Sequence, residues 1–539
     1  MSTNNEEIKT TTSRSGKPQY RKRGDKKGPR KQEDWSKCVD NAIEYYNKYP
    51  TDFDTAFNFP WFQVMGTPID YTNITSGFSK TLGKVENAST PSIMRIKFVM
   101  GPGICENAYD PANRTFAMIM ADLYAKTSGA SLGFNNAQLA MQMTSLTSII
   151  NMIGIVQRAL SCTEFYKTVN VNYPRSLLAA MGFDYDQVVA NKAISVNRLN
   201  SLIHMFNNMQ VPSFLDIYKR QYTLCSNVYV DEDDEFGQVY FFQPAGYYKY
   251  DFENFKAKWV DLTYGNTDVD IVLDAIRDAL YSWVNNDDFY KVNGALLRAY
   301  KDVPTIIVPD SSVNDVITPA KPDHIIDQIQ NMSIIKLDHN TLDIQQNVEK
   351  NLVYWQPCIP KEDGDLAPGT RGSMGKAIIR LFKDYPTNED NCEATRLMAY
   401  TAEVAYHTVD ISAGTDTVEL RQGIYSMQSE VVDSVEIYKV SADYTDVSVL
   451  ATIRSNYIPV YAPAQLTTWP TTSIESLKTI VAVQPFRYIP TLISRITMEG
   501  GVTTNMFMLG DLYNYTYIDR KVLYNMNTVA LLSLWRPTV

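Results

Sequence analysis

A stretch without a single charged side chain constrains the fold of this chain more than any other feature. Residues 127–157 contain no Asp, Glu, Lys or Arg. Polar amides interrupt the run, and no window approaches the ~20 consecutive apolar residues of a membrane-spanning helix. Its large apolar side chains recur at helical spacing, at Leu139, Met143, Leu146, Ile149, Ile150 and Ile153. The stretch therefore predicts a helix buried in a large helical layer.

The first 34 residues have the opposite character. Apart from Met1 and Ile8 they lack large aliphatic side chains. Between residues 9 and 31, ten Lys or Arg stand against the single acid Asp25, a net charge of +9. Because the whole chain of 539 residues carries −10, the other residues together carry −19. A segment of this kind cannot bury a core, so we expect a disordered basic arm on an acidic body.

The charge of the arm predicts contact with RNA. Lys and Arg in a tract interrupted by Gly and Pro neutralise phosphates without reading sequence. The predicted RNA-binding residues are Lys9, Arg14, Lys17, Arg21, Lys22, Arg23, Lys26, Lys27, Arg30 and Lys31. A solubilising tail or a nuclear import signal would have the same composition, so charge alone leaves these two alternatives open.

The remainder of the chain reads as a helix-dominated α+β protein. We expect helices at 38–46, 111–125, 135–167, 174–181, 185–209, 269–283, 376–384 and 389–402. Alternating residues predict strands at 94–99, 404–411, 416–421 and 431–440, and a hairpin that pairs 227–230 with 238–243. Residues 302–323 and 356–375 are rich in Pro, Gly and polar residues, which predicts two long surface loops.

Three motifs resemble functional loops but depart from them. Gly129–Gly133 has the Gly-x-Ser-x-Gly pattern around Ser131, yet a predicted helix precedes it where a hydrolase needs a strand. Gly369–Lys376 resembles a phosphate-binding loop, but its required first and last positions are Thr370 and Ala377. Asp231–Gly237 resembles a calcium loop with its glycine displaced by one position. We therefore expect a helix–helix turn, a surface loop and a solvated hairpin turn.

Cysteines and histidines give no further sign of chemistry. The six cysteines form no Cys-x-x-Cys pair, and no histidine lies within five residues of another histidine or beside a cysteine. This spacing excludes zinc ribbons and favours reduced thiols in a cytosol. We therefore expect no enzyme, no metal site and no cofactor. The alternative interpretation is a cytosolic enzyme or an RNA-associated binding protein with an unrecognised site.

One region resembles a known family. Residues Val169–Asp184, followed by Val189–Asn191, are similar to a segment of picobirnavirus capsid proteins. Further similarities follow in the same order along the chain, at Tyr218–Arg220, Val228–Asp231, Asp287–Phe289, Gln345–Val348, Glu393–Leu397 and Glu430–Val432. The chain length and the basic start also match, and the shared order of these segments carries the resemblance.

The resemblance implies a coat protein of a small icosahedral double-stranded RNA virus. Such proteins have a mostly helical shell domain and a smaller, β-richer projecting domain. They assemble as homodimers that exchange N-terminal segments, with the arm facing the packaged RNA. Some relatives lose this segment by self-cleavage and some perturb membranes. This sequence shows neither a cleavage signal nor an exposed amphipathic helix that would indicate membrane contact. We expect the protein in virions that assemble in the host cytoplasm.

On this basis we divide the chain into six segments. The division is a disordered arm at 1–34, shell domain at 35–226, a projecting hairpin at 227–265, shell at 266–339, a projecting domain at 340–460 and shell at 461–539.

Overall fold

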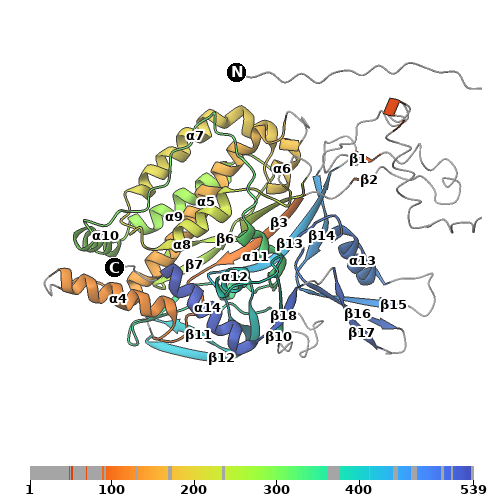
Figure 1. Ribbon diagram of the computed structural model, residues 1–539. Coiled ribbons are helices and arrows are strands. Elements are labelled where there is room, and N and C mark those ends of the chain that lie inside the picture. The colour runs from red at the N-terminus through yellow and green to blue at the C-terminus, as the bar shows by residue number, and fades with distance from the viewer. Residues whose placement is uncertain are drawn as a thin grey trace, which may run out of the picture. The chain divides into compact units, whose positions relative to one another are not determined.

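The computed structural model describes most of the chain after residue 92 (Figure 1). The described residues are 93–127, 131–167, 173–232, 237–361, 376–411, 413–440, 447–462, 470–498, 503–510 and 514–535, with short pieces before residue 93. Contacts divide the chain into two units, residues 1–61 and 62–539, and all the elements named below belong to the second. The arm expected at 1–34 and the helix expected at 38–46 lie outside the described residues.

Helix α5 (Asn136–Ser161) forms the centre of the helical layer. It begins at a capping box, in which the side chains of Asn135 and Gln138 each accept a hydrogen bond from the other residue's backbone N–H. Helices α4, α8 and α9 and strand β6 all pack against it. Among the described residues it alone is long and apolar enough to cross a membrane, but its apolar window is completely buried within this body. The prediction of a buried helix is confirmed.

The other helices surround α5 or cover the sheets. They are α4 (Pro111–Lys126), α6 (Tyr173–Met181), α7 (Tyr185–Asn207), α8 (Asp216–Ser226), α9 (Asp270–Val284), α10 (Asp287–Ala299), α11 (Asp323–Asn331), α12 (Asn388–Ala394), α13 (Thr471–Val483) and α14 (Arg520–Trp535). Short 3₁₀ turns occur at η2 (Cys162–Glu164) and η3 (His339–Thr341). Helix α4 begins with Pro111, as expected for a residue whose missing N–H would have no helical partner.

A five-stranded sheet joins distant parts of the chain. Its strand order is β14-β13-β3-β5-β4, with bounds β14 (Val447–Ile453), β13 (Glu430–Val440), β3 (Ile93–Met100), β5 (Val239–Pro244) and β4 (Tyr229–Val230). Strand β3 pairs antiparallel with β13 and parallel with β5. Nearly every residue of these two central pairs is buried, so the sheet carries core on both faces.

Smaller sheets complete the body. They pair β1 (Pro68–Ile69) with β2 (Ala88–Ser89), β6 (Gly246–Asp251) with β7 (Lys256–Asp261), β8 (Gln345–Asn347) with β9 (Leu352–Tyr354), β10 (Lys376–Arg380) with β18 (Tyr515–Asp519), and β11 (Tyr400–Asp410) with β12 (Thr415–Ser426). A three-stranded sheet has the order β15 (Tyr457–Ala462), β16 (Leu492–Met498) and β17 (Thr503–Leu509). The α+β class is confirmed.

Two predicted helices are wrong in whole or in part. Residues 376–384 begin with strand β10, in which Lys376 pairs with Asp519 and Ile378 with Tyr517. The β-branched Ile378 and Ile379 suit a strand, and the partner strand lies far along the chain. The helix expected at 389–402 ends at Ala394, and strand β11 begins at Tyr400.

The two segments expected to project contribute to the central sheet. The hairpin at 227–265 is present as β4 and β5, with Tyr229 opposite Tyr240, and both strands are buried. Residues 430–453 of the second segment form β13 and β14 of the same sheet. The hairpin of β11 and β12 is the most exposed pair of long strands in that segment. Which of these elements projects from a shell stays a prediction.

Because α5 is buried at the centre of the helical layer, a cavity at its middle should strongly lower the free energy of unfolding. Leu146 is fully buried, whereas Leu297 on α10 is 54% exposed. We expect Leu146→Ala to lower the free energy of unfolding by about 2–5 kcal/mol. Leu297→Ala is the matched control and should change it by less than about 0.5 kcal/mol. Urea unfolding followed by tryptophan fluorescence measures both, and equal effects would contradict the packing described above.

Candidate functional site

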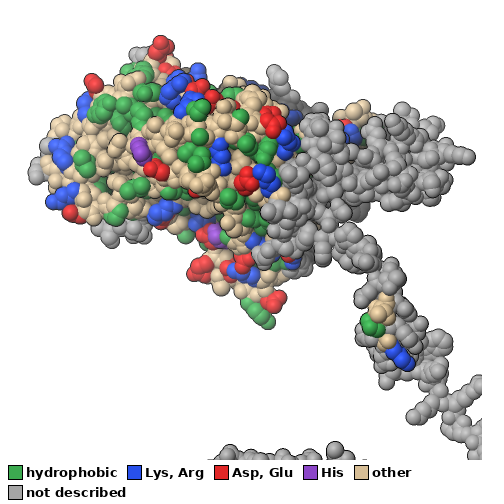
Figure 2. Space-filling view, turned by 90° about the horizontal axis from the view of Figure 1, so that it is seen from above, with side chains coloured by type: hydrophobic (Ala, Val, Ile, Leu, Met, Phe, Trp, Pro, Cys, Tyr) green, Lys and Arg blue, Asp and Glu red, His purple; other side chains and the backbone are tan. Residues whose placement is uncertain are grey.

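Many Lys and Arg side chains of the described body form ion pairs with carboxylates. Acidic and basic groups are interspersed on the face shown in Figure 2, and neither sign forms a continuous patch there. Surface pairs such as Arg175–Asp186 and Arg198–Asp270 link neighbouring elements. Interspersed charges of this kind give a polyanion such as RNA no continuous cationic surface on this face.

A buried ion pair joins β3 to β13 beside α6. Arg95 donates hydrogen bonds to the carboxylate of Glu436 and, over 3.0 Å, to the backbone carbonyl of Ala180. Lys97 Nζ lies 2.9 Å from the same carboxylate, and the Tyr438 hydroxyl donates to it over 2.8 Å. Burial alone would raise the pKa of Glu436, but the two cations outweigh it and lower this pKa to about 2. The carboxylate is therefore a fixed structural anion.

A second buried network ties α8 to the start of β13. Arg220 Nε donates to Glu430 Oε2 over 2.9 Å, and the Ser429 hydroxyl donates to Glu430 Oε1 over 2.7 Å. Gln221 also donates to Glu430, while its own Oε1 accepts from Asn151 of α5 over 2.7 Å. Each of these side chains bonds to another one within the fold, so the network holds α5, α8 and β13 together.

The motif around Ser131 lies between two helices. Helix α4 ends at Lys126 and α5 begins at Asn136, so Ser131 lies in an exposed helix–helix loop. A nucleophile elbow requires a strand on one side, which this loop does not have. The expected helix–helix turn is confirmed.

Three histidines of the described body lie within hydrogen-bond distance of carboxylates. His204 Nε2 lies 3.0 Å from Asp310, and His407 Nδ1 lies 2.9 Å from Asp416 Oδ1. His339 Nδ1 lies 2.6 Å from Asp261 Oδ1 and also faces Asp433, whose interaction raises the pKa of the imidazole. Among the residues with described side chains, no Ser or Cys hydrogen-bonds to a histidine, and no group of three His, Cys, Asp or Glu could hold a metal ion.

Of the two remaining loop motifs, the structure describes the ends of the hairpin turn at 231–237. Asp231 accepts hydrogen bonds from Gln238 N over 2.7 Å and from the Tyr240 hydroxyl over 3.1 Å, so its oxygens close the hairpin turn. Arg487 bonds to Glu232 in the same turn. Most of the segment 369–376 lies outside the described residues, and its last residue, Lys376, begins strand β10.

All ten predicted RNA-binding residues, Lys9 to Lys31, lie outside the described residues. The structure therefore brings none of them together, and their role stays a prediction.

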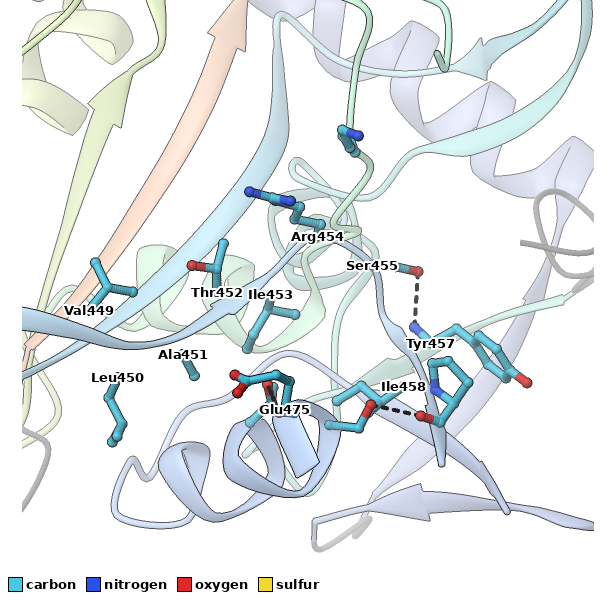
Figure 3. A pocket seen from close by; sticks show the side chains of 14 residues that line it. Val449, Leu450, Ala451, Thr452, Ile453, Arg454, Ser455, Tyr457, Ile458 and Glu475 are labelled. Carbon is cyan, nitrogen blue, oxygen red and sulfur yellow. Dashed lines mark hydrogen bonds between the residues drawn. The ribbon is translucent and has the colours of Figure 1, made fainter. Parts of the chain in front are cut away.

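An open groove follows the outer edge of β14 (Figure 3). Its volume is about 510 Å³. One wall is the run Val449–Ser455, and the other is built by the start of β15 and by Glu475, Ser476 and Thr479 of α13. The groove was not predicted from the sequence. The one local signal is the charge-free run 447–453, whose position at the edge of a sheet becomes apparent only from the tertiary structure.

Three comparisons with known proteins agree. The family model described as "Picobirnavirus, Capsid protein" matches residues 45–497. The capsid protein precursor of a human picobirnavirus (strain Human/Thailand/Hy005102/-) is 27% identical over 253 residues, which cover 46% of this chain and less than half, also 46%, of that relative. The X-ray structure of the picobirnavirus capsid has a TM-score of 0.70 with 18% identity, covering 89% of this chain and 96% of that one.

The solved structure shares the fold with this chain, and the family model spans most of its length. The chain belongs to the picobirnavirus capsid protein family, whose role is structural rather than enzymatic.

Proposed function

We propose that this protein is the coat protein that assembles into an icosahedral shell around an RNA genome, with homodimers as building blocks. The observation that carries the proposal is the fold match over 89% of this chain to a protein of the picobirnavirus capsid. The structural networks around Glu436 and Glu430 suit a rigid wall. The virion is the place of such a protein, and assembly in the host cytoplasm is part of the proposal.

Within this function, the arm binds RNA without sequence specificity. The body outside residues 9–31 carries −19 and would repel a polyanion, while the arm carries +9. The predicted contacts are the ten Lys and Arg residues from Lys9 to Lys31. The described body adds no obvious second cationic surface on the face of Figure 2, which supports the arm as the main RNA contact.

Purified protein viewed by electron microscopy tests the proposal directly. We expect closed particles of uniform diameter, and sedimentation should show them together with their dissociated dimers. A protein that remains monomeric at high concentration would contradict the coat function. In that case the alternative, a cytosolic enzyme or RNA-associated binding protein, would gain support. No membrane contact is proposed.

A further inference from the structure

Strand β14 leaves its outer edge unpaired. It is the last strand of the five-stranded sheet, and β13 occupies only its inner side. No described backbone or side-chain group outside β13 hydrogen-bonds to residues 447–453. The opposite edge of the sheet differs, because the two-residue strand β4 is continued by Ala320, which bonds to Val230 and Val228. The sheet therefore has one covered edge and one open edge.

The open edge has few of the features that normally prevent strand addition. Proteins protect exposed edges with charges, prolines, bulges or very short strands. The seven residues of β14 include neither a charge nor a proline. A register shift leaves Leu450 without a partner on β13, and this irregularity is its one protective feature. Such an edge is a template for another extended chain.

The groove beside β14 has the shape that an extended chain requires. Successive side chains of a strand point to opposite faces of a sheet. All residues from Val449 to Ser455 line the groove without a gap, so the groove follows the edge of the strand rather than one face. At about 3.3 Å per residue this run spans about 20 Å. Polar groups of Glu475, Ser476 and Thr479 on α13 form the opposite wall (Figure 3).

Helix α13 also presents an apolar stripe on its other side. Ile474, Leu477 and Val481 are 41%, 39% and 68% exposed. Their spacing of three and four residues places them on one face of the helix. At 100° per residue this face points away from Ser476 and Thr479, which line the groove. Exposed apolar residues that form a contiguous stripe mark a contact surface more often than scattered ones do.

We propose that a neighbouring copy of this chain lays an extended segment along β14 and covers the stripe on α13. This inference rests on the proposed coat function, which places copies of the same chain side by side. The groove is open in the single chain, and a shell would surround each copy with others of the same sequence. Only another extended backbone can pair with the free N–H and C=O groups of the edge. A strand alone buries little of the roughly 1,200–2,000 Å² of a stable interface, and the stripe on the far side of α13 supplies a separate apolar area to the same interface.

Three valine-to-lysine variants of the full chain test the contact. Val449→Lys places a charge in the groove, Val481→Lys places one on the stripe, and Val316→Lys, at a 57% exposed position in the loop 302–322, is the matched control. Since Val449 is 44% exposed, all three variants should fold with an unchanged melting temperature. We expect the first two to raise the protein concentration needed for assembly at least about tenfold, and the control to leave it unchanged.

Hydrogen–deuterium exchange on the wild-type protein tests the backbone pairing itself. Amides of 447–453 should exchange more slowly in assembled particles than in dissociated subunits. Particles that form with wild-type efficiency in both groove and stripe variants, without this protection, would overturn the inference and leave the coat function intact. Protection that is already present in dilute subunits would identify a segment of the same chain as the occupant and would also overturn it. A wild-type protein that never assembles would refute the coat function itself.

Discussion

A chain that begins at residue 35 should lose most of its affinity for RNA while its body stays folded. The removed segment carries ten Lys and Arg residues, and the remaining body is acidic. Each phosphate contact with single-stranded RNA contributes about 0.7 to the slope of log affinity against log salt. Nine net charges therefore give a slope of at most about −6. A fourfold rise in salt should then weaken binding of the complete chain by up to about 4 × 10³-fold.

Fluorescence anisotropy with a labelled single-stranded RNA, repeated at several salt concentrations, measures both the affinity and the slope. The matched control keeps the length of the arm but replaces its ten Lys and Arg residues with Gln. If charge is the cause, this control should bind as weakly as the truncated chain. Retained affinity in the truncated chain would show that RNA binding resides in the body. A flat salt response of the complete chain would show that neutralisation of phosphates by the arm does not cause the affinity.

Local sequence patterns predicted the parts of this fold that depend on local chemistry. The absence of charge over 127–157 was sufficient to predict that α5 is buried, because a helix that is apolar on all sides is stable only inside a protein. Proline and glycine fixed the bounds of several helices, such as α4 at Pro111 and α6 before Gly182, whose φ is +89°. In contrast, β10 and the end of α12 depend on strands far away in the chain, and the prediction of helix there was wrong.

The candidate interface depends even more on distant contacts. Strand β14 is an edge strand because β13 pairs with only one of its sides. The sheet itself depends on distant contacts, since Arg95 on β3 and Glu436 on β13 are 341 positions apart. The sequence of residues 447–453 does not indicate which strand lies next to them. The basic arm differs from this strand, because its net charge can be counted directly from the sequence. Contact between the arm and RNA could therefore be predicted without knowledge of the fold.

Removing the buried carboxylate of Glu436 should destabilise the body strongly. Arg95 would keep its charge in a site where its side chain is only 11% exposed. Loss of one partner from a buried pair typically costs about 3–5 kcal/mol, because the other charge remains without compensation. We expect Glu436→Ala to lower the free energy of unfolding by this amount, measured by urea denaturation at pH 7.

A double variant separates the charge from the packing. Arg95→Met combined with Glu436→Met fills the site with apolar side chains and leaves no buried charge from this pair. Replacing a buried ion pair in this way is often neutral or stabilising. The double variant should therefore be more stable than Glu436→Ala. If both are equally unstable, the pair acts through shape rather than through charge.

Acid provides the same test without mutating the wild-type protein. The folded pKa of Glu436 is about 2, below the value of about 4.3 for an unfolded glutamate. A carboxylate with a depressed folded pKa contributes stability that is complete above the unfolded pKa and is lost as the pH falls toward the folded one. Between pH 5 and pH 2 the wild-type protein should therefore lose more stability than the double variant. If the stability curves of the wild-type protein and the double variant are parallel over this range, Arg95 and Lys97 do not hold Glu436 ionised. The interpretation of Glu436 as a fixed anion between β3 and β13 would then be wrong.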